Sequence, residues 1–232
     1  MPNHVTTRVV LHGEPEQIAA FLQAHIREDQ EGKRFLDFDT VIPMPDAIRA
    51  TEATPEAQLG FVAAMRDAEA AARYLEYPWV MKEGIGTPEQ LFDWVERNRP
   101  EDFAKGIVSK QALAETGHAN WMEWTNESWG TKWSSYDYSE TDPAEAGPRF
   151  EFRFNTAWYF PIPIFEKLAD RWPKIAFEID CYDEGDTFEG TGWFNGSADD
   201  PPFALYDAGT NEGVQRRVYG DEVLENERDE HG

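Results

Sequence analysis

The chain has 232 residues, of which 41 % are hydrophobic and 14 % aromatic, so a packed core is expected and global disorder is excluded. Lys and Arg total 21 against 45 Asp and Glu, and the resulting net charge of −24 argues against direct binding to nucleic acid or to an anionic membrane. We expect a cytoplasmic location, because Cys181 is the single cysteine, no apolar run of about 18 residues predicts a membrane span, and the start lacks signal-peptide features.

The first predicted elements form a strand, a helix and a second strand. Residues 4–11 alternate between polar and apolar side chains, which predicts a strand. Apolar side chains then recur every three or four residues across 15–28, which is typical of an amphipathic helix. Period-two alternation over 34–41 predicts the second strand, and two prolines end this first half, residues 1–45.

A helical insertion is predicted over residues 46–118. Thr54 followed by Pro55 is a helix start, and the alanine-rich run after it favours one helix to about Leu75. Residues 87–90 have the pattern of a capping box for a second helix, and a third is expected over 100–117.

An aromatic segment over 121–136 opens the second half, which covers residues 119–200. Strict alternation over 149–158 predicts a strand, and a helix follows over 161–172. Two further strands, 174–182 and 187–194, are joined by a polar turn and form a hairpin.

This order of elements predicts an α+β fold of the ferredoxin-like class. Two strand–helix–strand halves combine into one antiparallel sheet, and right-handed crossovers place the two helices on one face. The helical insertion interrupts the two halves, and we expect it to cover the other face of the sheet.

Negative charge is concentrated toward the C-terminus. Residues 178–232 hold 16 acidic and 3 basic side chains, so this segment carries 3 − 16 = −13 of the total charge. We predict an acidic C-terminal tail over 201–232, with a frayed helix or disorder over 221–230. The acidity is explained by solubility, by a salt-adapted host, or by imitation of a nucleic-acid backbone that would occupy a DNA-binding enzyme.

Most of the chain outside the insertion resembles a known family. The resemblance rests on the string Trp129-Gly130-Thr131-Lys132-Trp133 after Trp121 and Trp124, and on the segments 1–5, 43–45, 154–158, 161–163, 188–190 and 195–196. These are similar to the YubB-type ferredoxin-like domain proteins of phages and conjugative plasmids, a family without a known function. The resemblance implies the ferredoxin-like fold and a mobile-element origin, and it supplies no catalytic residues.

Trp129, Lys132, Trp133 and Trp158 are the candidate ligand-binding residues. In one interpretation Trp129 and Trp133 fasten the insertion to the sheet, with Gly130 allowing a close approach. In the other they line an aromatic cleft in which Lys132 recognises an anion, or a base stacked on an indole ring.

Other site chemistries find little support in the sequence. Five carboxylates crowd the hairpin (Asp180, Asp183, Glu184, Asp186 and Glu189), but without EF-hand spacing, so we expect a solvated turn. The five histidines show no zinc pattern, no nucleophile-elbow or P-loop motif is present, and Cys181 is expected to be a buried structural thiol. One further hypothesis is that removal of Met1 exposes the secondary amine of Pro2, which would act as a general base in tautomerase-like chemistry. We expect no metal, no cofactor and no catalytic residue.

The leading functional hypothesis is a non-enzymatic protein of a phage or plasmid. It would bind a host or plasmid protein through an acidic surface and an aromatic cleft, with an anti-defence role as one version. The alternatives are a small-ligand-binding protein or enzyme that uses the cleft around Lys132, Trp133 and Trp158, and a mimic of a nucleic-acid backbone.

Overall fold

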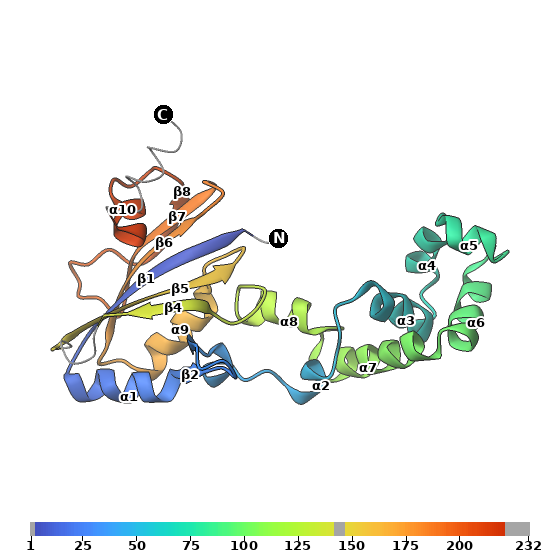
Figure 1. Ribbon diagram of the computed structural model, residues 1–232, viewed down its shortest axis with the longest axis horizontal. Coiled ribbons are helices and arrows are strands. Elements are labelled where there is room, and N and C mark those ends of the chain that lie inside the picture. Colours follow the sequence, from blue (N-terminus) through green and yellow to red (C-terminus); the bar gives the residue numbers. More distant parts are fainter. Residues whose placement is uncertain (1–2, 142–146, 221–232) are drawn as a thin grey trace. The chain divides into compact units, whose positions relative to one another are not determined.

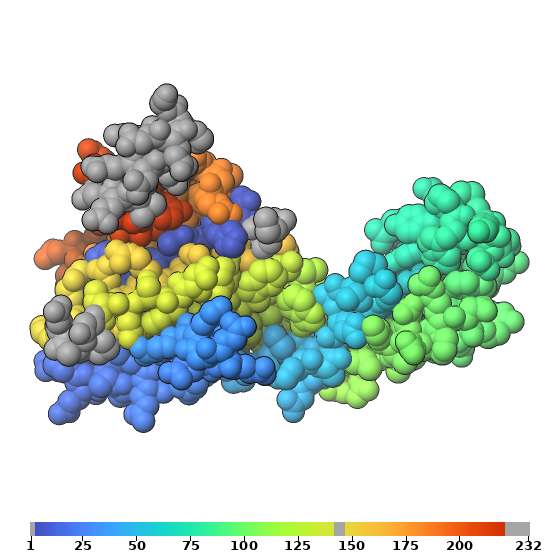
Figure 2. All heavy atoms as spheres, viewed as in Figure 1, coloured from blue at the N-terminus to red at the C-terminus, as the bar shows by residue number. Residues whose placement is uncertain are grey.

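The computed structural model describes residues 3–141 and 147–220, which divide into two compact units (Figure 1). One unit combines Met1–Pro43 with Thr125–Gly232, and the other is Met44–Trp124. The helical unit, which runs from light blue to green in Figure 2, begins two residues before the predicted insertion and ends six residues after it. It therefore includes the first tryptophans of the aromatic segment, Trp121 and Trp124.

A six-stranded antiparallel sheet forms the first unit, in the order β4-β5-β1-β6-β7-β8. The strands are β1 (His4–His12), β4 (Tyr136–Glu140), β5 (Arg149–Ala157), β6 (Ala176–Asp183), β7 (Phe188–Phe194) and β8 (Ala204–Asp207). Strand β1 lies between β5 and β6 and is antiparallel to both, and α9 (Ile162–Arg171) connects these two strands. This split strand–helix–strand arrangement is that of a ferredoxin-like domain, as the sequence predicts.

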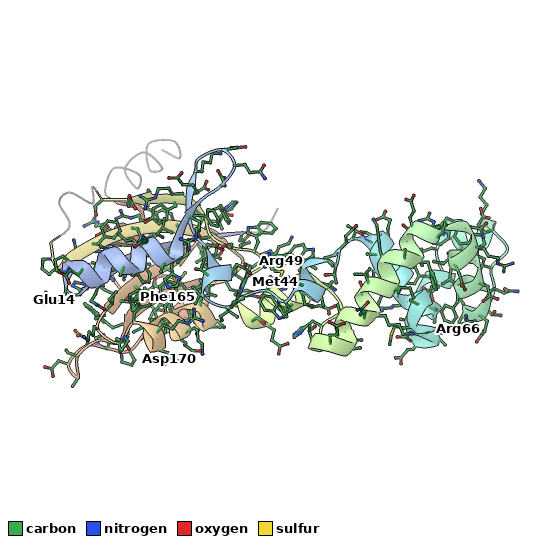
Figure 3. All side chains as sticks on the ribbon, turned by 90° about the horizontal axis from the view of Figure 1, so that it is seen from below. Glu14, Met44, Arg49, Arg66, Phe165 and Asp170 are labelled. Carbon is green, nitrogen blue, oxygen red and sulfur yellow. The ribbon has the colours of Figure 1, made fainter. Side chains whose placement is uncertain are left out.

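Aromatic side chains of alternate strand positions form the core on one face of the sheet. Phe165 of α9 stacks on Phe154 of β5, with ring centroids 6.3 Å apart, and it points from the helix toward the sheet (Figure 3). Phe21 of α1 (Pro15–His25) meets Phe177 of β6 edge to face at 5.7 Å. Both helices therefore cover the same face, which confirms the prediction.

The predicted second strand over 34–41 is wrong in extent and in place. Only β3 (Arg34–Leu36) is extended, and it pairs with β2 (Ile26–Glu28) in a separate two-stranded sheet. The side chain of Asp37 accepts a hydrogen bond from the Asp39 amide, which starts a 3-10 turn over Phe38–Thr40. The edge position beside β5 belongs instead to β4, which follows the aromatic segment.

The face opposite α1 and α9 carries α10 (Val214–Tyr219). From the sequence we expected the helical insertion to cover this face. Val214 and Val218 of this helix are buried against Tyr182 of β6. Helix α10 and strand β8 both lie in the segment predicted as an acidic tail, so that prediction is wrong over 204–219. The spacing of two valines in a charged segment is too weak a signal to predict a packed helix. The stretch 221–230 lies outside the described residues.

The helical unit contains more helices than the three predicted. They are α2 (Asp46–Arg49), α3 (Pro55–Met65), α4 (Ala68–Leu75), α5 (Pro78–Lys82), α6 (Pro88–Asn98), α7 (Pro100–Thr116) and the first half of α8 (Trp121–Ser128). The alanine-rich run breaks because Arg66 adopts a left-handed conformation and Asp67 caps the next helix through the Ala70 amide. The capping box at Thr87 and Gln90 is present as predicted.

Candidate functional site

Trp129 is an anchor inside the ferredoxin-like unit. Its side chain is 5 % exposed, its indole Nε1 donates a hydrogen bond to the Ile42 carbonyl at 2.9 Å, and its ring packs edge to face on Phe38. Two residues later, the Thr131 hydroxyl donates to the Ala157 carbonyl at 2.7 Å, at the end of β5. These bonds fix the aromatic segment to the sheet, and Trp129 is absent from the candidate cleft.

Gly130 allows the close approach between this segment and the start of α9. Its φ of +76° lies in the left-handed region, and a Cβ at this position would lie 2.8 Å from Cδ of Pro163. Both facts favour glycine, because a side chain would be strained by the backbone and crowded by the proline ring.

Lys132, Trp133 and Trp158 come together in the structure. The Lys132 ammonium lies 4.6 Å from the ring centroid of Trp133 and 4.7 Å from that of Trp158. Both distances suit cation–π attraction, and within the described part of the chain no carboxylate forms an ion pair with this ammonium. Three of the four predicted site residues therefore form one cluster.

The junction between β5 and α9 holds Trp158 in an uncommon conformation. Its φ is +76°, which costs energy for a residue with a side chain. Its amide donates to the Asn3 carbonyl at 2.9 Å, and the Thr156 hydroxyl donates to the Tyr159 carbonyl at 2.8 Å. These bonds present Trp158 half-buried and leave Tyr159 58 % exposed.

A hollow of about 670 Å³ opens beside Trp158 on the ferredoxin-like unit. Its walls are Asn3, Asn126, Trp158, Tyr159, Asp183, Thr187 and Phe188. Only Trp158 among these was predicted as a site residue. Tyr159 follows Trp158 at the junction of β5 and α9. The others come from segments far apart in sequence, namely the residue before β1, helix α8 and the hairpin of β6 and β7, so no local motif marks them.

Asp183 is the most unusual residue of the hollow. It ends β6 and is 1 % exposed, and its Oδ2 accepts hydrogen bonds from the Thr187 hydroxyl at 2.5 Å and the Thr187 amide at 3.3 Å. Its Oδ1 is buried and accepts no hydrogen bond from the residues that the structure describes. Such an atom is costly, because burial removes water and no protein group replaces it.

The turn between β6 and β7 exposes Glu184 and Asp186, as expected from the sequence, whereas the other three hairpin carboxylates are buried. Asp180, Asp183 and Glu189 are at most 2 % exposed. Glu189 accepts hydrogen bonds from the amides of Gly209 and Asn211, and thereby holds the loop that follows β8. Among the residues that the structure describes, no group of three His, Cys, Asp or Glu side chains is arranged to hold a metal ion.

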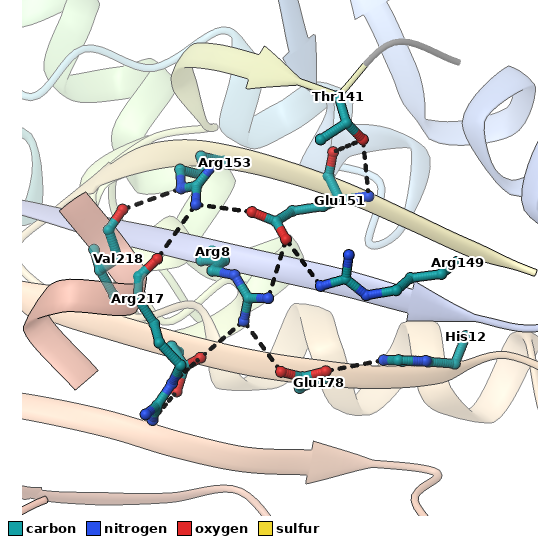
Figure 4. A network of polar contacts seen from close by, with 10 residues as sticks. Arg8, His12, Thr141, Arg149, Glu151, Arg153, Glu178, Arg217 and Val218 are labelled. Atoms are coloured by element: carbon teal, nitrogen blue, oxygen red, sulfur yellow. Dashed lines mark hydrogen bonds and ion pairs between the residues drawn. The ribbon is translucent and has the colours of Figure 1, made fainter. Parts of the chain in front are cut away.

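Asp180 accepts hydrogen bonds from Arg8 and Arg217, which are labelled in Figure 4 as part of a polar network on the face that carries α10. Arg8 of β1 donates to Glu151 of β5 and to Glu178 and Asp180 of β6, at 3.0 to 3.1 Å. Burial alone would raise the pKa of Glu151, but the hydrogen bond and charge of Arg8 keep that pKa below its usual value. The network therefore joins three strands in the middle of the sheet.

Cys181 is fully buried in β6, as predicted, and burial raises the pKa of its thiol well above the usual value. The thiol is therefore protonated at neutral pH, which makes it a poor nucleophile.

None of the helices among residues 3–141 and 147–220 combines the length and the apolar character needed to cross a membrane.

The sheet order, the split strand–helix–strand unit and the two helices on one face define a ferredoxin-like α+β domain. Residues 128–199 match the family model of the ferredoxin-like domain in Api92-like protein. The matched span runs from the end of α8 past β7, and so contains Lys132, Trp133, Trp158 and Asp183.

Among solved structures, the chain is similar to protein api92 from Yersinia pseudotuberculosis, with 10 % sequence identity and a TM-score of 0.42. The alignment covers 91 % of this chain and 100 % of that one. A comparison with curated proteins found no significant match.

Proposed function

We propose that this protein is a non-enzymatic binding protein, and that a partner protein binds at the end of the sheet where β5 meets α9. The observation that carries the proposal is the exposure of large aromatic side chains there, with Tyr159 58 % and Trp133 36 % exposed. Aromatic side chains are enriched in protein interfaces, because they bury a large area at a low cost in conformational entropy.

Charge supports the choice of partner. The net charge of −24 attracts a basic protein surface and repels nucleic acid and anionic membranes. The partner we propose is therefore a protein with a basic surface, of host or plasmid origin, met in the cytoplasm. A DNA-binding enzyme occupied by a backbone mimic would be one such partner.

A phage or plasmid origin is part of the proposal. It is supported by the resemblance of Trp129–Trp133 to the YubB-type proteins. An anti-defence role is one form that binding to a host factor would take.

The test is affinity capture from a host lysate with the wild-type protein and two tyrosine variants. Tyr159→Ala removes the exposed ring beside the hollow, and Tyr206→Ala removes a ring of 38 % exposure from β8. We expect one set of basic proteins that is lost with Tyr159→Ala, kept with Tyr206→Ala and weakened by salt. Capture that Tyr159→Ala leaves unchanged would overturn the proposal.

A small-ligand site at the Lys132 cluster is the second candidate. It is favoured by the position of this ammonium between two indole rings without a carboxylate partner among the described residues. An anion, or a base stacked on Trp133, fits this arrangement. Titration with inorganic phosphate and with a nucleoside monophosphate, followed by tryptophan fluorescence, tests it, because Lys132→Gln should abolish any saturable change.

A further inference from the structure

Asp183 in the wall of the hollow beside Trp158 has a hydrogen-bond acceptor that no described residue uses. Asp183 Oδ1 is buried and has no partner among residues 3–141 and 147–220, whereas Oδ2 of the same carboxylate is held by Thr187. Thr187 therefore holds Oδ2, and a ligand that supplies a donor at this wall of the hollow would satisfy the buried Oδ1. A charged acceptor of this kind selects a donor group, and a cationic donor most strongly.

Aromatic rings beside the carboxylate suit a flat cation. Tyr159 and Phe188 are stacked with ring centroids 6.3 Å apart and an interplanar angle of 21°, and both line the hollow. The exposed face of Tyr159 can receive a planar guanidinium group, which is weakly hydrated and stacks on aromatic rings. Trp158 is less suited to this contact, since Lys132 already lies over its ring.

Two amide side chains complete the polar wall. Asn3 and Asn126 line the same hollow, and each carries a carbonyl oxygen that can accept a further N–H from a guanidinium fork. The overall charge of −24 raises the local concentration of cations around the protein.

We propose that this hollow binds the guanidinium group of an arginine side chain, with Asp183 Oδ1 as the charged acceptor and Tyr159 as the stacking surface. The inference rests on the proposed function, because it assigns the hollow to an arginine on the surface of the basic partner protein.

The experiment uses the full chain and a short peptide, acetyl-Gly-Arg-Gly-amide, as the probe. Binding is followed by NMR chemical shifts and by isothermal titration calorimetry at low salt. The matched probes carry citrulline, which has the shape of arginine without its charge, or lysine. We expect saturable millimolar binding of the arginine peptide, and affinity at least about fivefold weaker for both other peptides.

Three variants locate the site. Asp183→Asn and Tyr159→Ala should each weaken arginine binding by at least about fivefold, because one removes the charge and the other the stacking ring. Asp170→Asn, at an exposed carboxylate of α9 labelled in Figure 3, removes the same charge elsewhere and should leave binding unchanged. Tyr159 is an exposed side chain, so its variant reports on the site even where Asp183→Asn fails to fold.

Equal binding of the arginine and citrulline peptides, or equal losses with Asp170→Asn and Asp183→Asn, would overturn the inference. Lysine binding as tight as arginine would also overturn it, because a point charge would then suffice. The inference can fail while the proposed function holds. Capture of a partner that depends on Tyr159 but not on an arginine of that partner would support the proposed function alone.

Discussion

The backbones of Gly60 in α3 and Gly106 in α7 lie in direct contact. A Cβ at Gly106 would lie 2.0 Å from the carbonyl carbon of Gly60, and a Cβ at Gly60 would lie 1.7 Å from the carbonyl oxygen of Asp102. The two helices can approach this closely because neither residue has a side chain. Neither glycine adopts a φ that requires glycine, so the requirement is one of space alone.

We therefore expect Gly60→Ala to force α3 and α7 apart and to destabilise the helical unit by more than about 3 kcal/mol. The control is Gly86→Ala in the same unit, since a Cβ there would come no closer than 3.7 Å to the Gln90 side chain. Urea unfolding, with amide hydrogen exchange to follow the helical unit, measures both changes. Similar stabilities of the two variants would contradict the packing described.

Gly130→Ala should destabilise the ferredoxin-like unit through two separate effects, a left-handed backbone and a contact of 2.8 Å with Pro163. Gly32→Ala is its control, because Gly32 has a φ of +77° but nothing within 4 Å of its Cβ position. We expect a loss of about 1 kcal/mol for Gly32→Ala and about 2–4 kcal/mol for Gly130→Ala. Thermal unfolding gives both values, and equal losses would show that Pro163 moves aside without cost.

Arg217 of α10 holds the helix to the sheet through a two-pronged contact with Asp180. Its Nε and Nη2 donate to the two oxygens of this buried carboxylate at 3.0 and 2.8 Å. Arg217→Met should cost about 1–3 kcal/mol and increase hydrogen exchange in α10. Arg217→Lys keeps the charge but not the fork, so an intermediate loss is expected. If Arg217→Met left exchange in α10 unchanged, the buried valines and the hydrogen bonds from Arg153 to backbone carbonyls of α10 would suffice to hold the helix.

His25 is buried as a neutral imidazole with both ring nitrogens in use. The Thr40 hydroxyl donates to the Asp37 carbonyl, so His25 Nδ1–H donates to the Thr40 oxygen at 2.8 Å. His25 Nε2 then accepts the indole N–H of Trp172 at 3.0 Å. A proton on Nε2 would face this N–H, and the second hydrogen bond would be lost.

This arrangement makes stability depend on pH. Burial, assisted by the positive charges of Arg171 and Arg27, lowers the pKa of His25 from 6.5 to about 4. The unfolded chain binds a proton below pH 6.5 and the folded chain only near pH 4, so stability falls as the pH drops through this window. The expected loss for this residue is about 3 kcal/mol in total.

The difference between wild type and His25→Gln isolates this effect, because the glutamine amide can also donate to Thr40 and accept from Trp172 but does not titrate. Melting temperatures between pH 7 and pH 4 should fall less steeply in the variant. Parallel curves would mean that His25 does not contribute to the loss of stability in acid.

Elements with a strong local signal could be predicted from the sequence. The alternation in β1 and β5, the capping box of α6 and the end of α7 at Gly117 depend on neighbouring residues, and the structure has each of them. Lys132 and Trp133 are adjacent in sequence, so the contact between their side chains could also be predicted from the sequence.

Elements whose place depends on distant partners could not be predicted in this way. The alternation over 34–41 suits an edge strand of the main sheet, but that edge is taken by β4 because Tyr136 and Ser139 find partners on β5. Helix α10 is short and charged, and contacts with residues distant in sequence hold it, among them Tyr182, Asp180 and Arg153.

The sequence by itself determined the antiparallel α+β class, the interruption by helices and the strongly acidic character, because period-two alternation, helix caps and charge are local properties. Only the tertiary structure decided that Asp183, Tyr159 and Asn126 share one hollow and that none of the described residues donates to one oxygen of Asp183. Hydrogen-bond satisfaction is a property of the whole packed arrangement, so a residue's own neighbours in sequence do not reveal it.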